Sequence, residues 1–250
     1  MNRSTKSSCR IPKPLRIAID TNILIGLINE EDRLHESSIK LVTSVDILLV
    51  STSVVMETVN TFTKKVLDVF TDVNQYILSS KQVNHSELVE YLNKKRPRYV
   101  NFNKYVAKKV TELWEKHRDV FTVFIEITRE LRELADFEKI MDFIEQKLDV
   151  NATLELYGVD RGNSTDLEMF EEILNELEEC NITFKDNFDR EIFIETVAYS
   201  RKTNTRQFIF VTDDKEFFNK ANRGLNCLNI RSISFCMLGN ALNKLTRMKS

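Results

Sequence analysis

Apolar residues along the chain switch between two periods, and these switches predict strands that alternate with helices. Short continuous apolar runs at 17–19, 45–50 and 207–211 are typical of buried parallel strands, and a further short strand pattern lies within 226–235. Between the runs, apolar residues recur every three to four positions, as they do on one face of an amphipathic helix. Alternating strands and helices of this kind predict an α/β fold with a central parallel sheet covered by helices.

The middle of the chain, residues 64–180, shows an almost uninterrupted helical period. Its apolar stripe over 102–148 is too long for one ordinary helix, so we expect two or three antiparallel helices there. Pro97 interrupts the pattern before that stripe, because proline removes a helical hydrogen bond. The sequence therefore predicts a three-layer α/β/α domain formed by 16–63 and 181–250, with an all-helical insertion between the two blocks.

Charge is distributed unevenly along the chain although the net charge is only −2. The segments 1–16, 93–109 and 217–250 contain basic residues and no acid, whereas 126–180 is strongly acidic. Separate basic segments can hold a polyanion while the acidic part stays away from it. Residues 1–15 are expected to form a basic N-terminal arm. The chain shows neither a secretory signal nor an apolar run near the roughly 20 residues that cross a membrane, so we expect no membrane association.

Cysteine usage indicates a reducing compartment. The four cysteines, Cys9, Cys180, Cys227 and Cys236, form no CxxC pair and no metal-ligand spacing. Free thiols are the simplest expectation, because disulfides are rare where glutathione and thioredoxin keep thiols reduced. Together with the absence of a secretory signal, this pattern predicts a cytoplasmic protein.

Acidic residues occur where a parallel sheet would bring them to one edge. Asp20 ends the first strand, Glu57 lies one turn into the helix after the second strand, Asp189 opens a later helix, and Asp214 follows the strand over 207–211. The carboxyl ends of parallel strands share one edge of the sheet, so we expect these acids to converge there. Convergent carboxylates repel each other unless a cation neutralises them, and an all-oxygen cluster suits Mg²⁺ or Mn²⁺.

Polar neighbours of these acids have two expected roles. Asn22 and Thr212 lie beside Asp20 and Asp214 in the sequence, so we expect them to orient ligands or bound waters. Asp213 is expected to act in the same way and is a rival of Asp214 for the last acidic position. The alternative is that Asp189 and Asp214 serve only as helix N-caps, a common use of aspartate.

The same acids fall in the order of a known family motif. The matching segments are Ile19–Leu24, Leu34–Ser38, Val55–Glu57, Asp189–Ile192 and Val211–Phe217. They resemble PIN-domain ribonucleases in order and kind, and the resemblance places the family's acids on Asp20, Glu57, Asp189 and Asp214. For the third acid, Asp186 and Glu191 are alternatives to Asp189. The resemblance implies a three-layer fold, Mg²⁺ or Mn²⁺ as cofactor, and cleavage of single-stranded RNA by metal-activated water.

Partners and alternatives follow from the same resemblance. Many PIN-domain ribonucleases are the toxic half of a toxin–antitoxin pair, which implies a protein inhibitor or antitoxin as a partner. The insertion over 64–180 departs from the compact toxins and leaves three roles open for it: a lid, a selector of substrate or the contact of a homodimer. A non-catalytic scaffold that binds RNA or protein is the alternative function, with the acids in structural roles.

A basic and aromatic stretch within the insertion is a candidate RNA contact. Its residues are Lys94, Lys95, Arg96, Arg98, Tyr99 and Lys104. Interleaved cations and rings suit phosphate contact and base stacking. A solvated turn between helices, with its aromatic residues buried, is the equally weighted alternative.

Overall fold

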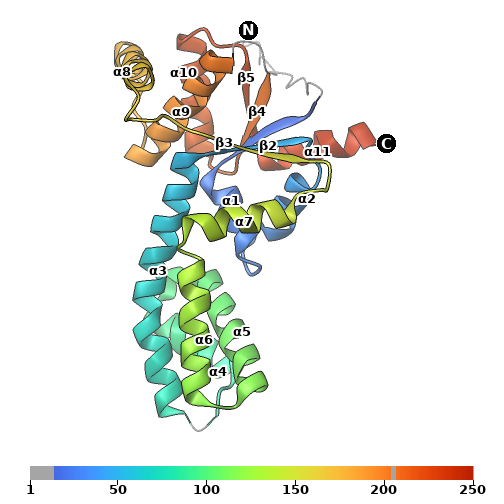
Figure 1. The fold of residues 1–250 in the computed structure, drawn as a ribbon, viewed down its shortest axis with the longest axis vertical. Coiled ribbons are helices and arrows are strands. Elements are labelled where there is room, and N and C mark those ends of the chain that lie inside the picture. The colour runs from blue at the N-terminus through green and yellow to red at the C-terminus, as the bar shows by residue number, and fades with distance from the viewer. Residues whose placement is uncertain (1–13, 81, 204–206, 250) are drawn as a thin grey trace, which may run out of the picture. The chain divides into compact units, whose positions relative to one another are not determined.

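A computed structural model of the chain describes residues 14–80, 82–203 and 207–249 (Figure 1). The described chain divides into two compact units. The first, which we call the sheet unit, falls within the ranges 1–23, 39–54 and 147–250. The second, the helical unit, falls within 24–38 and 55–146. Most of the predicted basic arm, residues 1–13, lies outside the described residues.

The sheet unit contains, within the described residues, five strands in the order β3-β2-β1-β4-β5. Their bounds are Arg16–Ile19 for β1, Ile47–Ser51 for β2, Thr153–Tyr157 for β3, Phe208–Thr212 for β4 and Ile233–Met237 for β5. Each neighbouring pair is parallel. The apolar strands β1 and β4 are buried along their whole length, as parallel strands flanked by helices require. The expected parallel α/β fold is confirmed.

The strand order creates a topological switch point between β1 and β4. From β1 the chain moves outward through β2 to β3, and it returns on the other side of β1 through β4 and β5. Ile19 lies opposite Val211 in the register, and the backbone N–H of Asp20 donates to the Val211 carbonyl at 3.0 Å. Open α/β sheets bind ligands at the carboxyl edge of such a switch point. The residues that follow β1 and β4 therefore meet at the place where a ligand is expected.

Aromatic packing joins the helices of the sheet unit to β4 and β5. The helices that lie wholly in this unit are α8 (Ser164–Glu179), α9 (Asn187–Thr203), α10 (Lys215–Cys227) and α11 (Leu238–Lys249). Phe210 of β4 and Phe235 of β5 lie 4.8 Å apart by ring centroids, and Phe235 also contacts Phe193 of α9 and Phe217 of α10. Buried rings at such distances stabilise a core beyond the area that they bury.

The helical unit contains the helices predicted for the middle of the chain. Its elements include α3 (Thr52–Ser79), α4 (His85–Lys95), the 3₁₀ turn η1 (Pro97–Tyr99), α5 (Val100–His117), α6 (Val120–Glu133) and α7 (Phe137–Lys147). Helices α1 (Thr21–Ile28), α2 (His35–Val42) and α3 have residues in both units. The long apolar stripe over 102–148 is divided among α5, α6 and α7, as expected. No helix in the described chain is long and apolar enough to cross a membrane.

The bounds predicted for the all-helical insertion, 64–180, are too wide. Strand β3 pairs in parallel with β2, and α8 also belongs to the sheet unit, so the helical unit ends near residue 146. β3 is an edge strand in which only Tyr157 is buried. Five residues that are mostly half-exposed leave no apolar run, and this is why periodicity alone did not separate β3 from its helical surroundings.

The expectation of free thiols is wrong for two of the four cysteines. Cys180 and Cys227 form a disulfide across 47 residues of sequence. The segment after α8 brings them together, since Phe184 in that segment packs against rings of α9 and α10. Cys236 is buried in β5, and Cys9 lies outside the described residues. The inference of a reducing compartment, which rested on free thiols, therefore loses its support.

Candidate active site

Asp20 is the most firmly held acid at the switch point. It directly follows β1, and only 5% of its surface is exposed. One carboxylate oxygen, Oδ1, accepts the backbone N–H of Thr21 at 2.8 Å. The other, Oδ2, accepts the amide of Asn22 at 2.9 Å and the hydroxyl of Thr212 at 2.5 Å. Three donors from rigid elements therefore fix the orientation of this carboxylate.

Thr212 and Asn22 connect the end of β1 with the end of β4. The Thr212 hydroxyl donates to Asp20 and accepts the backbone N–H of Asp214 at 2.9 Å. The Asn22 carbonyl oxygen accepts the backbone N–H of Asp213 at 3.2 Å. The two polar residues predicted to support the acids thus hold the loop after β4 beside Asp20. Asp213 enters this network through its backbone.

Asp214 is the N-cap of α10. Its Oδ1 accepts the backbone N–H groups of Glu216 at 2.7 Å and Phe217 at 2.9 Å. The capping alternative is therefore observed, and it occupies one carboxylate oxygen. The second oxygen has no hydrogen-bond partner among the described residues. Capping therefore leaves one carboxylate oxygen of Asp214 available to bind a metal ion or another ligand.

The start of α9 distinguishes the three candidates for the third acid. Asp186 precedes the helix, and its carboxylate accepts the backbone N–H of Asp189 at 3.0 Å, as an N-cap does. Glu191 forms an ion pair with Arg161 at 2.8 Å. Asp189 lies in the first turn of α9, and it stays the predicted third acid because of the family motif.

Glu57 lies on α3, in the part of that helix that belongs to the helical unit. Of the four predicted acids, the hydrogen bonds of Thr212 bring Asp20 and Asp214 together, and the convergence of Asp189 and Glu57 with them stays a prediction. Within the described residues, no three or more His, Cys, Asp or Glu side chains gather into a cluster that could hold a metal ion.

The carboxylate oxygens at the switch point suit a hard cation such as Mg²⁺, which does not need all of its ligands from the protein. Mg²⁺ keeps several of its waters and is usually held by one or two carboxylates together with substrate phosphates. Asp20 and Asp214 supply carboxylate oxygens at the carboxyl edge of adjacent strands, and Thr212 links them by hydrogen bonds. The chemistry of these residues therefore fits Mg²⁺ or Mn²⁺.

Glu195 is a buried acid that the sequence reasoning missed. Only 7% of its surface is exposed on α9. Its carboxylate accepts the hydroxyl of Ser51 at 2.5 Å and the backbone N–H of Ser53 at 3.1 Å. Burial raises the pKa of this carboxyl above its ordinary value, against hydrogen bonds from Ser51 and Ser53 that lower it. Glu195 thus fixes the turn between β2 and α3. Its position within the apolar run Ile192–Ala198 was the signal that could have identified it.

Two residues of the predicted RNA-contact stretch have acidic partners within the helical unit. Arg96 forms an ion pair with Asp72, with Nε and Oδ2 3.0 Å apart. The hydroxyl of Tyr99 donates to Asp68 at 2.6 Å. These two residues hold η1 against α3, so their side chains have structural partners.

The remaining basic residues of the stretch face solvent. They are Lys94, Lys95, Arg98 and Lys104. Within the part of the chain that the structure describes, none of the four forms an ion pair with a carboxylate. Uncompensated, exposed cations at the end of α4 and the start of α5 remain available to a polyanion.

Comparison with known proteins identifies a domain within this chain. A sequence model of the PIN-domain family matches residues 17–137. The match includes Asp20, Asn22 and Glu57, and it ends before Asp189 and Asp214. No curated protein and no solved structure matched the chain. PIN domains are mostly nucleases and typically use divalent metals. The chain thus contains a PIN domain over residues 17–137.

Proposed function

We propose that this chain is a metal-dependent endoribonuclease that hydrolyses phosphodiester bonds of single-stranded RNA. The observation that supports the proposal best is the hydrogen bond from Thr212 to Asp20, which joins segments 192 residues apart at the switch point. A buried carboxylate held by three donors at a ligand-binding edge suits the positioning of a cation for phosphoryl chemistry.

Each residue of the site has a proposed task. A bound Mg²⁺ or Mn²⁺ supplies an activated water and neutralises charge on the cleaved phosphate. Asp20 and Asp214 would hold the ion through carboxylate oxygens, while Asn22 and Thr212 keep Asp20 in one orientation. Catalytic roles for Asp189 and Glu57 rest on the family motif.

The substrate class is supported by the exposed cations of the helical unit. Lys94, Lys95, Arg98 and Lys104 can contact the phosphates of a flexible strand, because they carry charge without a carboxylate partner among the described residues. Arg96 and Tyr99 are left out of this proposed surface, since both are held by acids of α3.

We expect the protein to cut a mixed-sequence single-stranded RNA in Mn²⁺ or Mg²⁺ and to leave it intact in EDTA. The reason is that a bound divalent cation would lower the pKa of its water and stabilise charge on the phosphate, and EDTA removes that cation. The measurement is the initial rate of cleavage by gel, with a DNA strand of the same sequence as a control for substrate class. RNA that is bound but uncut under every metal condition would support the scaffold alternative.

Removing the exposed cations should weaken RNA binding and flatten its salt dependence. Each phosphate contact to a single strand contributes roughly 0.7 to the slope of log affinity against log salt, so loss of up to four contacts should lower the slope by at most about 3. The variant replaces Lys94, Lys95, Arg98 and Lys104 with Ala, and binding is measured by fluorescence anisotropy in EDTA.

A matched control removes the same number of cations from ion pairs elsewhere in the helical unit. Its replacements are Lys108, Lys109, Arg129 and Lys139 to Ala, each of which has a carboxylate partner. If both quadruple variants lower the slope equally, the contact is not specific to the ends of α4 and α5, and this part of the proposal fails.

A further inference from the structure

An apolar surface lies on two neighbouring helices of the helical unit. Five of the exposed large apolar side chains that the described residues place on α3 and α6 form it: Leu67 and Leu78 at 71% and 77% exposure, and Phe121, Phe124 and Ile125 at 70%, 37% and 47%. Met56, near the start of α3, is 42% exposed and is not counted in it. The helices pack side by side here, because the rings of Phe70 and Phe124 lie 5.8 Å apart. We call this surface the α3–α6 face.

A pocket of about 400 Å³ opens within the α3–α6 face, between the last turns of α3 and the first turns of α6. Its lining is Asn74, Ile77, Leu78, Asp119, Val120, Phe121 and Phe124. The side-chain oxygen of Asn74 is buried and has no hydrogen-bond partner among the described residues.

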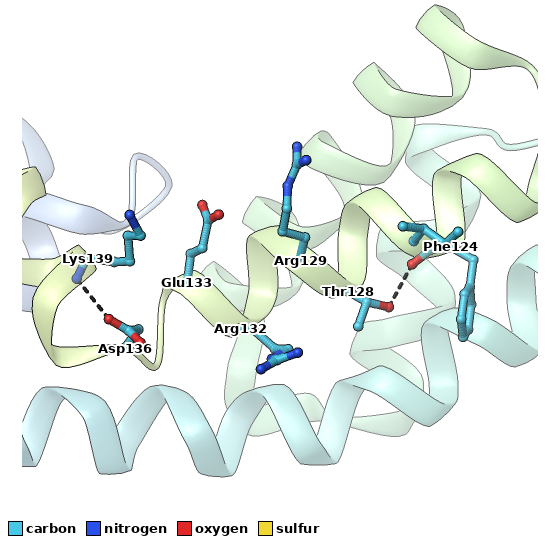
Figure 2. A pocket seen from close by; sticks show the side chains of 8 residues that line it. Phe124, Thr128, Arg129, Arg132, Glu133, Asp136 and Lys139 are labelled. Carbon is cyan, nitrogen blue, oxygen red and sulfur yellow. Dashed lines mark hydrogen bonds between the residues drawn. The ribbon is translucent and has the colours of Figure 1, made fainter.

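Charged side chains of α6 lie around the apolar surface. Figure 2 shows Arg129 and Glu133 pointing away from the side of α6 that carries Phe124 and Thr128, while Arg132 lies on that side. Arg129 is engaged in an ion pair with Glu126 of the same helix. The rings of Phe121 and Phe124 are 70% and 37% exposed and can contact an apolar partner.

The area of the face agrees with one half of a stable dimer. From their exposed fractions, the five side chains present apolar surface on the order of 500 Å², near the upper end of patches on monomeric proteins. A standard interface buries about 800 Å² on each partner, of which somewhat more than half is apolar. The face thus holds about the apolar area that one partner in such an interface contributes.

The face also carries both halves of a self-complementary contact. Phe121 and Leu78 are 70% and 77% exposed, and both also form part of the wall of the pocket. A two-fold interface uses the same patch on both subunits, so projections and a hollow on one patch can interlock with their own copies. We propose that a second copy of this chain covers the α3–α6 face in a two-fold homodimer, with Phe121 of each copy packing into the other's pocket.

Sedimentation equilibrium at micromolar protein tests the proposal without reference to nuclease activity. The wild-type chain should sediment at twice its monomer mass of 29.3 kDa. Replacing Phe121 and Leu78 with Glu should raise the dissociation constant at least about 100-fold, because charges would be buried at the centre of the interface. Both residues are exposed, so helical content by circular dichroism should be unchanged.

The control is Val150→Glu, which places the same charge on a 99% exposed apolar residue of the sheet unit and should leave the dimer intact. A wild-type protein that is monomeric throughout the micromolar range overturns the proposal. So does a dimer that the double variant leaves unchanged, since its interface would then lie elsewhere.

Discussion

Replacing Asp20 with Asn should lower the rate of RNA cleavage by about 10³-fold or more while leaving RNA binding in EDTA unchanged. Asparagine keeps the shape of the side chain but removes its charge and one of its two acceptor oxygens. Asp20 uses both oxygens to accept hydrogen bonds, from Thr21, Asn22 and Thr212. The variant therefore loses attraction for a cation and disturbs the network that orients the site, and such preorganised electrostatics dominates many rate enhancements.

The measurement is single-turnover cleavage in Mn²⁺, with thermal unfolding recorded on the same samples. Glu191→Gln is the matched control, since Glu191 is a partly exposed acid of α9 whose partner is Arg161. Its rate should stay within about threefold of wild type, as expected for a surface ion pair. An Asp20→Asn variant that cuts RNA at the wild-type rate would exclude the switch point as the catalytic site.

Reduction of the Cys180–Cys227 disulfide should lower the free energy of unfolding by about 4 kcal/mol. A cross-link across 47 residues restricts the unfolded chain, and the chain-entropy relation gives a stabilisation of that order. The measurement is urea unfolding with and without a reductant. A Cys180→Ser, Cys227→Ser double variant should have the lower stability in both conditions.

Cys236→Ser is the control for this prediction, because Cys236 lies outside the disulfide. That variant should still lose stability when reductant is added. If reductant leaves the wild-type unfolding curve in place, the cross-link either does not form in solution or does not stabilise the fold.

The parts of the fold that depend on local patterns of apolar and polar residues were predictable. The apolar runs before Asp20 and Thr212 each end in polar residues that begin a new segment, and this pattern predicted strands whose ends share an edge. Which strands pair was not predicted, and the structure places β1 between β2 and β4. Strand β3 could not be separated from helix, since its five residues at the sheet edge carry no clear period.

Features that depend on contacts distant in sequence were not predictable. The sequence spacing of Cys180 and Cys227 does not indicate that they form a disulfide, because only the course of the segment after α8 brings them together. Sequence alone could not show that the carboxylate of Asp186 accepts the backbone N–H of Asp189 at the start of α9. Glu195 was overlooked because its partners come from β2 and α3.

The central position of β1 has a consequence for how the chain folds during synthesis. Its residue Ile17 is paired with Ile209, so one side of β1 must wait for a strand that is made about 190 residues later. At about 5–20 residues per second, a ribosome needs roughly 10–40 s to cover that distance. Pairings this distant form slowly, and an open strand edge is a site of aggregation. The contact that joins Thr212 to Asp20 can therefore form only after residue 212 has been made, and until then the edge of β1 that pairs with β4 stays open in the nascent chain.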